Sequence, residues 1–382
     1  MVSGAVWSDL DGDGWPELVL ACEWGPIRVF HNDRGQLREV TAELGLADKI
    51  GWWNGVTTGD LDGDGRLDII AANWGGNTKY ESHREKPLRL YYGDPDGDGS
   101  WPMLESHFEP AMNQYVPDRM LESVAKAMPF LLGRFPTHQT WAEAGMDAAL
   151  GDRRDRMRFL EANWLESTAF LNRGGRFEAR ILPLEAQLAP AFAVCVADYD
   201  GDGREDVFLS QNFFGVDSET SRYDAGRGLW LQGDGRGGFR AVPGQESGVK
   251  VYGEQRGAAV ADFDGDGRVD LVVTQNRAAT KLFRNVTGRP GLRVRLAGPE
   301  GNPHGIGAVV RLEFGEVHGP VREIHAGSGY WSQDSVVPVL ATPTTPTRVW
   351  VRWPGGRVTT AELPSGAREV EAKVDGQVRL IR

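Results

Sequence analysis

The apolar residues of this chain fall in short runs bounded by glycine and acidic residues. One set of Val-, Ile-, Leu- and Ala-rich runs covers residues 17–21, 67–71, 206–209 and 270–273. A second set precedes these runs, at residues 4–7, 55–58, 192–196 and 257–260. A third set follows them, at residues 27–30, 88–91, 228–231 and 281–283. Short aliphatic and β-branched runs are typical of strands in a packed sheet, so the pattern predicts a mainly β protein.

An acidic phrase, Asp-x-Asp-Gly-Asp-Gly, is repeated between such strands. It occurs five times, starting at Asp9, Asp60, Asp94, Asp198 and Asp262. Strand, acidic loop, strand, strand, glycine-rich turn and closing strand make a unit of about 50 residues, which is the size of a four-stranded propeller blade. The third and fourth starts lie 198 − 94 = 104 residues apart, so an insertion or a blade without its own loop must lie between them.

Two stretches depart from this pattern. Residues 109–166 have the composition and apolar spacing of two or three helices, and we expect a helical insertion from one blade. Residues 291–382 lack the acidic phrase and alternate apolar with polar positions, which predicts a small antiparallel β-domain. Residues 1–288 are then propeller blades. They either close a ring of five or six unequal blades or form an incomplete propeller that is part of a longer protein.

Composition narrows the class of partner. The 382 residues carry a net charge of −12, which argues against nucleic acid and anionic membranes. No apolar run approaches the roughly 20 residues of a membrane span, so we expect no membrane insertion. The N-terminus shows no basic segment followed by an apolar one, so we expect no signal peptide in this chain. Two cysteines, Cys22 and Cys195, cannot build a disulfide framework.

The acidic phrase has the chemistry of a calcium site. Carboxylates at positions 1, 3 and 5 converge when glycines at positions 4 and 6 let the backbone curl. Four loops add a carboxylate at position 9, and the position-7 carbonyl supplies another hard oxygen, a set that suits Ca²⁺ better than Mg²⁺. We expect up to five structural Ca²⁺ sites. Their expected ligand residues are Asp9, Asp11, Asp13, Trp15, Glu17, Asp60, Asp62, Asp64, Arg66, Asp68, Asp94, Asp96, Asp98, Ser100, Glu105, Asp198, Asp200, Asp202, Arg204, Asp206, Asp262, Asp264, Asp266, Arg268 and Asp270.

An EF-hand is one alternative, because its loop begins in the same way. It requires flanking helices and a bidentate Glu at position 12. Position 12 in four of the loops is apolar: Leu20, Ala71, Leu209 and Val273. The third loop has Pro102 at position 9 and Glu105 at position 12, and we expect a weakened site in which Glu105 substitutes as a ligand. Plain Asp-Gly turns without metal are the other alternative.

These repeated loops resemble the FG-GAP/VCBS repeat family over residues 2–287. Through residues 305–310, 327–333 and 349–356, the C-terminal part resembles the ASPIC/UnbV domain. The resemblance implies an integrin-α-like β-propeller that holds Ca²⁺ in its Asp-rich loops, at an extracellular or cell-surface location. Residues 338–343 depart from the glycine-rich segment usual at that place in the ASPIC/UnbV domain.

The sequence contains no recognisable catalytic constellation. The seven histidines lack the His-x-x-x-His spacing of zinc sites, and neither a Gly-x-Ser-x-Gly elbow nor a Walker loop occurs. We expect a non-enzymatic, calcium-stabilised binding or adhesion scaffold for a protein or glycan ligand. A carbohydrate-recognition propeller and an enzyme that uses a propeller face are the alternatives. Aromatic residues at the rim above polar side chains would favour carbohydrate recognition. Ionisable groups with perturbed pKa values in a central pocket would favour an enzyme.

Overall fold

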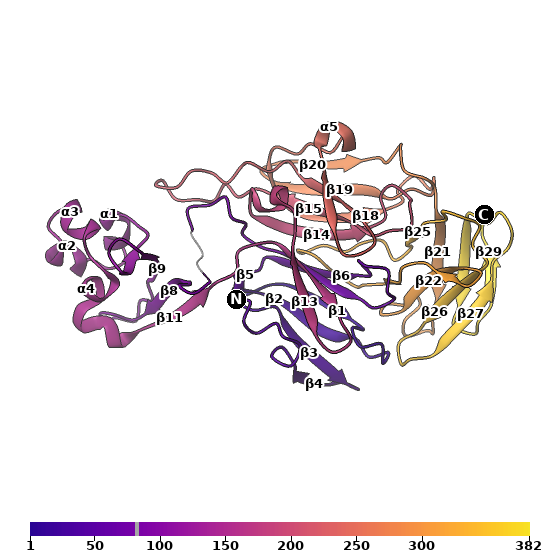
Figure 1. The fold of residues 1–382 in the computed structure, drawn as a ribbon, viewed down its shortest axis with the longest axis horizontal. Helices are drawn as coiled ribbons and strands as arrows, with labels where there is room; N and C mark the ends of the chain where they lie inside the picture. Colours follow the sequence, from indigo (N-terminus) through magenta and orange to yellow (C-terminus); the bar gives the residue numbers. More distant parts are fainter. Residues whose placement is uncertain (81–83) are drawn as a thin grey trace.

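The computed structural model describes residues 1–80 and 84–382, and its architecture is mainly β (Figure 1). Four antiparallel sheets form the body of the molecule, and we number them blades 1 to 4. Blade 1 contains β1 (Val2–Ser8), β2 (Glu17–Gly25), β3 (Arg28–Asp33) and β4 (Gln36–Glu39), with β5 (Gly51–Trp52) paired to β2. Blade 2 contains β6 (Gly55–Gly59), β7 (Asp68–Ala72), β12 (Thr168–Asn172) and β13 (Phe177–Ile181).

The other two blades differ in strand number. Blade 3 contains β14 (Ala191–Ala197), β15 (Asp206–Gln211), β16 (Leu229–Gly233) and β17 (Phe239–Val242). Blade 4 contains β18 (Glu254–Ala261), β19 (Asp270–Asn276) and β20 (Ala278–Phe283). The short helices η2 (Leu184–Gln187) and α5 (Gly244–Ser247) lie before β14 and between β17 and β18. The predicted mainly β class is confirmed, and the sheets are propeller-like blades.

Successive blades pack face to face through their apolar residues. Val19, Val56 and Phe170 belong to one buried cluster between blades 1 and 2, and further clusters lie between blades 2 and 3 and between blades 3 and 4. Inner strands approach closely where a side chain is absent. A Cβ at Gly55 would lie 2.1 Å from the carbonyl oxygen of Phe192 in β14. Both faces of β6 and β14 are buried, and burial on both faces explains the nearly continuous apolar run of β14.

The chain leaves blade 2 after β7 and returns to the same sheet at β12. We call the intervening excursion the insert. It holds a sheet of β8 (Leu88–Gly93), β9 (Met103–Glu109), β10 (Gln114–Pro117) and β11 (Met157–Ala162). Its helices are α1 (Leu121–Ala125), α2 (Phe130–Arg134), α3 (His138–Ala142), α4 (Met146–Leu150) and η1 (Gly151–Arg156). It has its own apolar core, which includes Leu104, Met128 and Trp141.

The insert is therefore longer and less helical than predicted. The helices fall inside the expected residues 109–166, but four strands accompany them. The run at 88–91, which the pattern assigns to the third strand of a blade, forms β8 of the insert instead, and β12 takes the third place in blade 2. Local apolar patterning could not distinguish the run at 88–91 from the run that forms β12, because both are short and mainly apolar.

The C-terminal domain consists of two sheets around one core. One sheet contains β21 (Leu292–Ala297), β25 (Val339–Leu340), β28 (Glu369–Lys373) and β29 (Val378–Leu380). The other contains β22 (Val309–Phe314), β23 (Val317–His318), β24 (Arg322–Glu323), β26 (Arg348–Arg352) and β27 (Val358–Glu362). Both sheets supply residues to a common apolar cluster. The expected antiparallel arrangement holds except for β21 and β28, which pair in parallel.

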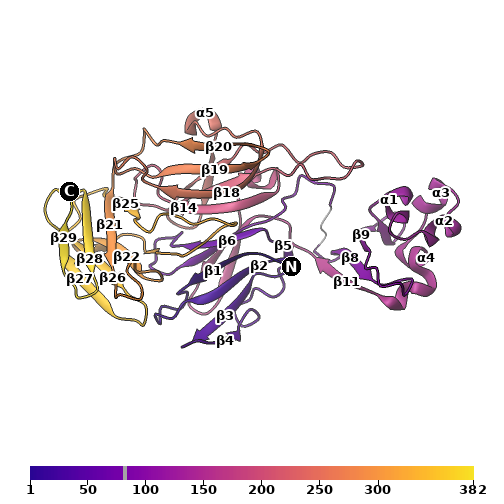
Figure 2. The same cartoon turned by 180° about the vertical axis from the view of Figure 1, so that it is seen from behind.

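The insert and the C-terminal domain lie at opposite ends of the body, as the two views show (Figures 1 and 2). Cys22 and Cys195 are buried free thiols. Within the described residues, no helix has the length and apolar character needed to cross a membrane.

Candidate metal centres

The acidic phrases at the body blades form four loops, one in each blade. We call them loop 1 (residues 9–17), loop 2 (60–68), loop 3 (198–206) and loop 4 (262–270). Each connects the first strand of its blade to the second. In loop 3, Asp198 accepts hydrogen bonds from the backbone N–H groups of Gly201 and Gly203, both at 2.7 Å. Both glycines have a positive φ, of 74° and 92°, which lets the backbone curl around the position-1 carboxylate as the sequence predicts.

The curled loops bring carboxylates together. Ligand oxygens at positions 1, 3 and 9 lie within 4.8 Å of one another in loops 2, 3 and 4. In loop 1 the oxygens at positions 1, 3 and 5 converge in the same way, and a second group combines positions 3 and 9 with His31. The converging residues of the carboxylate groups are Asp9, Asp11, Asp13, Asp60, Asp62, Asp68, Asp198, Asp200, Asp206, Asp262, Asp264 and Asp270.

The position-5 carboxylates of loops 2 to 4 have a different partner. Asp64 and Asp202 form ion pairs with the arginines at position 7 of their own loops, Arg66 and Arg204. Loop 4 repeats this pair at position 5 and position 7, at 2.6 Å. Each position-5 carboxylate also accepts the position-7 backbone N–H. The arginine side chains thus occupy carboxylate oxygens that the sequence assigns to metal, a competition that loop spacing does not reveal.

Burial makes the carboxylates at positions 1 and 9 costly to ionise without a cation. Desolvation raises the pKa of Asp60 and Asp198 to about 7, although backbone hydrogen bonds oppose the effect. It raises the pKa of Asp68 and Asp206 at position 9 to about 8. Glu17 in loop 1 also has a pKa raised to about 7, first by burial and then by the charge of the neighbouring position-3 carboxylate. A bound dication would offset both burial and mutual repulsion.

Two carboxylate oxygens in loop 2 point to a cation directly. Asp60 Oδ1 and Asp62 Oδ1 are buried and have no hydrogen-bond partner. Asp60 is 1% exposed, and its other oxygen accepts two backbone N–H groups. Buried unpaired polar atoms are rare in folded proteins. An all-oxygen donor set of this kind fits Ca²⁺.

The acidic phrase in the insert forms a fifth turn, which we call the insert loop (residues 94–99). Its backbone curls as in loop 3, because Asp94 accepts hydrogen bonds from the N–H groups of Gly97 and Gly99 at 2.7 and 2.9 Å. It connects β8 to β9. Asp96 pairs with Arg153 at 2.9 Å, and Asp98 accepts hydrogen bonds from Ser100. Among the residues that the structure describes, three ligand atoms converge in loops 1 to 4 but not in the insert loop.

Glu105, the expected substitute ligand of this loop, has other partners. Its carboxylate accepts a hydrogen bond from the hydroxyl of Tyr80 at 3.0 Å and pairs with Arg119 at 3.1 Å. Within the described residues, the insert loop therefore shares the backbone curl of the other four loops but lacks their three converging ligand atoms. Its position 9 is Pro102, so the loop has no carboxylate where loops 1 to 4 supply one.

The C-terminal domain contacts the loops at position 1. Arg352 of β26 pairs with Asp9 at 2.9 Å, and Arg293 of β21 pairs with Asp262 at 2.5 Å. Arg293 also pairs with the buried Glu369 at 3.2 Å. The loops thus form part of the interface between the blades and the C-terminal domain.

Loops 2 and 3 are reached by residues 321 and 322. The backbone N–H of Val321 donates to Asp60 Oδ2 at 3.0 Å. Arg322, whose side chain is 14% exposed, pairs with Glu205 at position 8 of loop 3. No local sequence pattern predicts these contacts, because they join segments more than 100 residues apart.

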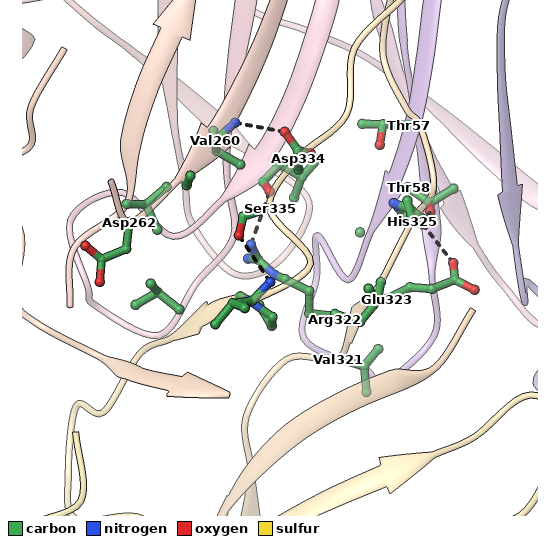
Figure 3. Close-up of a pocket in the computed structure, with 18 residues that line it drawn as sticks. Thr57, Thr58, Val260, Asp262, Val321, Arg322, Glu323, His325, Asp334 and Ser335 are labelled. Carbon is green, nitrogen blue, oxygen red and sulfur yellow. Dashed lines mark hydrogen bonds and ion pairs between the residues drawn. The ribbon is translucent and has the colours of Figure 1, made fainter. Parts of the chain in front are cut away.

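A small polar cavity of about 50 Å³ lies between blade 2, blade 4 and residues 321–339 of the C-terminal domain, which we call the C-terminal segment (Figure 3). His325 hydrogen-bonds Glu323 at 2.9 Å and Thr58 at 3.3 Å. Asp334 accepts the backbone N–H of Val260 at 2.9 Å, and burial raises the pKa of its carboxyl. A space of this size holds water, not a substrate. These groups attach the C-terminal segment to the inner strands.

Comparisons with known proteins agree with the repeated loops. The chain matches the FG-GAP-like repeat family over residues 9–71 and the ASPIC and UnbV family over residues 298–378. It is 22% identical over 477 residues to cartilage acidic protein 1 of Homo sapiens, a match that covers 95% of this chain and 70% of that protein.

Two solved structures, those of rhamnogalacturonan lyases YesW and YesX, match with TM-scores of 0.31 and 0.30 at 11% and 14% identity. Each match covers 96% of this chain, which spans 58% and 57% of the two lyases. The sequence relationships confirm the expected resemblance: the chain carries an FG-GAP-like repeat and an ASPIC and UnbV domain, and it is a distant homologue of cartilage acidic protein 1.

Proposed function

We propose that this protein is a non-enzymatic binding scaffold, extracellular or at the cell surface, whose propeller-like blades are stabilised by cations in their acidic loops, with Ca²⁺ in loops 2 to 4. The observation that carries the proposal is the pair of unpartnered buried oxygens of Asp60 and Asp62. A folded protein tolerates such atoms when a ligand satisfies them. Calcium at extracellular modules binds with a Kd of roughly 10⁻⁴–10⁻³ M, so the sites would fill outside the cell.

Calcium would also strengthen the attachment of the C-terminal domain. Position-1 carboxylates of loops 1, 2 and 4 accept hydrogen bonds or ion pairs from that domain. A cation that fixes each loop fixes the surface on which the domain lies. Loop order and domain attachment are therefore linked in this proposal.

The test compares thermal unfolding in EDTA, in Ca²⁺ and in Mg²⁺. We expect the melting temperature to fall on chelation and to recover with Ca²⁺ more than with Mg²⁺, since a ligand that binds only the folded state stabilises it. Calcium titration by calorimetry should reveal several sites. A melting temperature that is unchanged in excess EDTA, in protein shown to be metal-free, would refute calcium stabilisation.

A second candidate function is carbohydrate recognition, and a specific cavity favours it. A space of about 850 Å³ lies between blade 1 and the insert. Trp24 and Trp52 line it from blade 1, and Trp101 and Met103 line it from the insert. Trp52 is stacked on Trp74 with ring centroids 4.2 Å apart, which holds its indole in place. Trp24 has a φ of +54°, a strained conformation of the kind found at binding sites.

Polar groups complete this cavity. Arg119 is held between Glu105 and Asp217 by ion pairs, and all three line the space. Aromatic walls that bury an apolar ring face, with a few fixed polar groups for hydroxyls, are the usual means of binding a polar ring compound. This arrangement supports an oligosaccharide as the ligand.

Calorimetric titration with a panel of neutral and acidic oligosaccharides tests this second function. Trp101 is 66% exposed, so Trp101→Ala removes a wall of the cavity without disturbing a core. We expect the variant to lose at least tenfold in affinity for any glycan bound by the wild type. Trp331→Ala is the matched control, since Trp331 is 88% exposed and does not line the cavity. Equal losses in both variants, or no glycan bound by the wild type, would refute carbohydrate recognition at this cavity.

A further inference from the structure

The four body loops share a contact that allows their surroundings to be compared position by position. The third strand of each blade ends beside the loop, and one backbone N–H there donates to the position-9 carboxylate. The N–H donors are Asn32, Asn172, Gly233 and Asn285, at 3.4, 2.7, 2.8 and 2.7 Å. The residues just before these donors are therefore equivalent: His31, Leu171, Gln232 and Arg284.

Three of the equivalent side chains have nothing to offer a metal in this arrangement. Leu171 is apolar and buried. Gln232 donates its amide N–H to Asp200 at 2.5 Å, and Arg284 pairs its guanidinium with Asp264. Amide and guanidinium nitrogens carry hydrogens and have no free lone pair for a cation. Loops 2 to 4 therefore present oxygen donors alone.

His31 changes the donor set of loop 1. Its Nδ1 lies 3.3 Å from Asp11 Oδ2 and 3.2 Å from Glu17 Oε1. One ligand atom from each of the three residues lies within 4.8 Å of the other two. A neutral imidazole presents a nitrogen lone pair, and this is the commonest metal ligand among side chains. Loop 1 and the end of β3 together offer one nitrogen and two carboxylates.

The charges around loop 1 also differ from those around the other loops. Position 7 is Trp15, whereas loops 2 to 4 have an arginine there that pairs with the position-5 carboxylate. Across residues 1–80 and 84–382, His31 is the only basic side chain within ion-pair distance of Asp11 or Glu17. A dication bound by these two carboxylates would meet no paired guanidinium. A cavity of about 430 Å³ borders all three residues and leaves room for water as a further ligand.

We propose that Asp11, Glu17 and His31 form a site for a divalent transition metal of the zinc class, separate in ion preference from the oxygen-only loops. Mixed imidazole and carboxylate donors suit Zn²⁺ and related ions, whereas Ca²⁺ takes oxygen ligands. Three protein ligands with an open fourth position match a tetrahedral ion that also binds water. The inference rests on the proposed metal-binding role of the acidic loops and specifies which ion loop 1 selects.

The experiment titrates metal-free protein with Zn²⁺ by calorimetry while saturating Ca²⁺ occupies the oxygen sites. We expect one Zn²⁺ per chain in the wild type. His31→Leu copies the residue of blade 2 and His31→Gln copies that of blade 3, so both should fold. We expect both to bind Zn²⁺ more than about tenfold more weakly, since even groups that only support a metal ligand contribute that much. Their calcium-dependent rise in melting temperature should stay as in the wild type.

Asp62→Asn in loop 2 is the reciprocal control, expected to reduce calcium stabilisation and leave Zn²⁺ binding unchanged. Perturbation of one histidine ring signal in NMR spectra, absent in His31→Gln, would identify the nitrogen ligand. Zn²⁺ binding of wild-type strength in both His31 variants, or no stoichiometric Zn²⁺ binding in the wild type, would overturn the inference. Zn²⁺ binding that needs His31 in a protein that Ca²⁺ fails to stabilise would instead refute the proposed calcium scaffold and leave the zinc-class site standing.

Discussion

Replacing Asp60 with asparagine should stabilise the metal-free protein, which is the reverse of most substitutions in a buried site. Asp60 is 1% exposed, and burial raises the pKa of its carboxyl from 3.8 to about 7. Keeping this group ionised in the fold at pH 7.5 costs roughly 4 kcal/mol of unfolding free energy. An amide removes that cost.

The amide also preserves the existing hydrogen bonds. Asp60 Oδ2 accepts the N–H groups of Val321 and Gly65 at 3.0 and 3.1 Å, and the amide oxygen can take its place. The amide nitrogen would then replace Oδ1, which has no partner. Burying an unpaired N–H group costs about 1–3 kcal/mol. The expected net gain for Asp60→Asn without metal is therefore about 1–3 kcal/mol.

Calcium should offset most or all of the advantage of asparagine. The variant lacks one charged ligand, so its calcium-dependent gain should be smaller by about 2.7 kcal/mol at a free concentration 100-fold above Kd. Urea unfolding at pH 7.5, followed by circular dichroism in EDTA and in CaCl₂, measures both quantities. Asp33→Asn, at an exposed position of the β3–β4 turn, is the control and should change neither. An Asp60→Asn protein that is less stable than the wild type in EDTA and equally responsive to calcium would refute the reasoning.

Three further outcomes follow from the same structure. The metal-free protein should lose stability as the pH rises from about 4 to 8, because the buried loop carboxylates have a pKa raised in the folded state and bind protons that the unfolded chain has lost; a flat pH profile in EDTA would contradict this. Arg293→Ala should cost about 3–5 kcal/mol in urea unfolding, because it leaves the carboxylate of Asp262 buried without its ion-pair partner and removes one of the arginines that pair with Glu369. Arg379→Ala, at an exposed ion pair, should cost less than about 1 kcal/mol, and equal losses would argue against the buried network. Gly55→Ala should cost about 1–3 kcal/mol or more, because its methyl group would meet the backbone of β14; unchanged stability would mean that the blades separate easily.

Most of the correct expectations came from the spacing of residues that lie close together in the sequence. The acidic phrase places glycines at positions 4 and 6, and both adopt positive φ values in loops 1 to 4. The strands on either side follow from runs such as residues 17–21 and 67–71, which lie in β2 and β7 or at their start. Within one loop, a carboxylate reaches its neighbours through a few bonds of rotation. Such geometry depends on residues close in sequence, so it can be predicted without the fold.

The same reasoning failed where the outcome depends on distant segments. The insert loop repeats the acidic phrase, yet it connects two strands of the insert, and Glu105 faces Tyr80 and Arg119. His31 lies 20 residues beyond Asp11 and shows no metal-ligand spacing, but strand pairing brings it to loop 1. Sequence distance hides these relations, because β-strand pairing joins residues that share no local period.

The sequence by itself determined a mainly β chain with curled, acid-rich loops between strands and a separate C-terminal β-domain. Only the tertiary structure decided that blade 2 is split by the insert, that the C-terminal domain lies on the position-1 carboxylates and that arginines occupy the position-5 carboxylates. The physical reason is burial. The local sequence determines which carboxylate oxygens can converge. The packing of distant segments determines which of these oxygens are desolvated, and desolvated carboxylates need a cation.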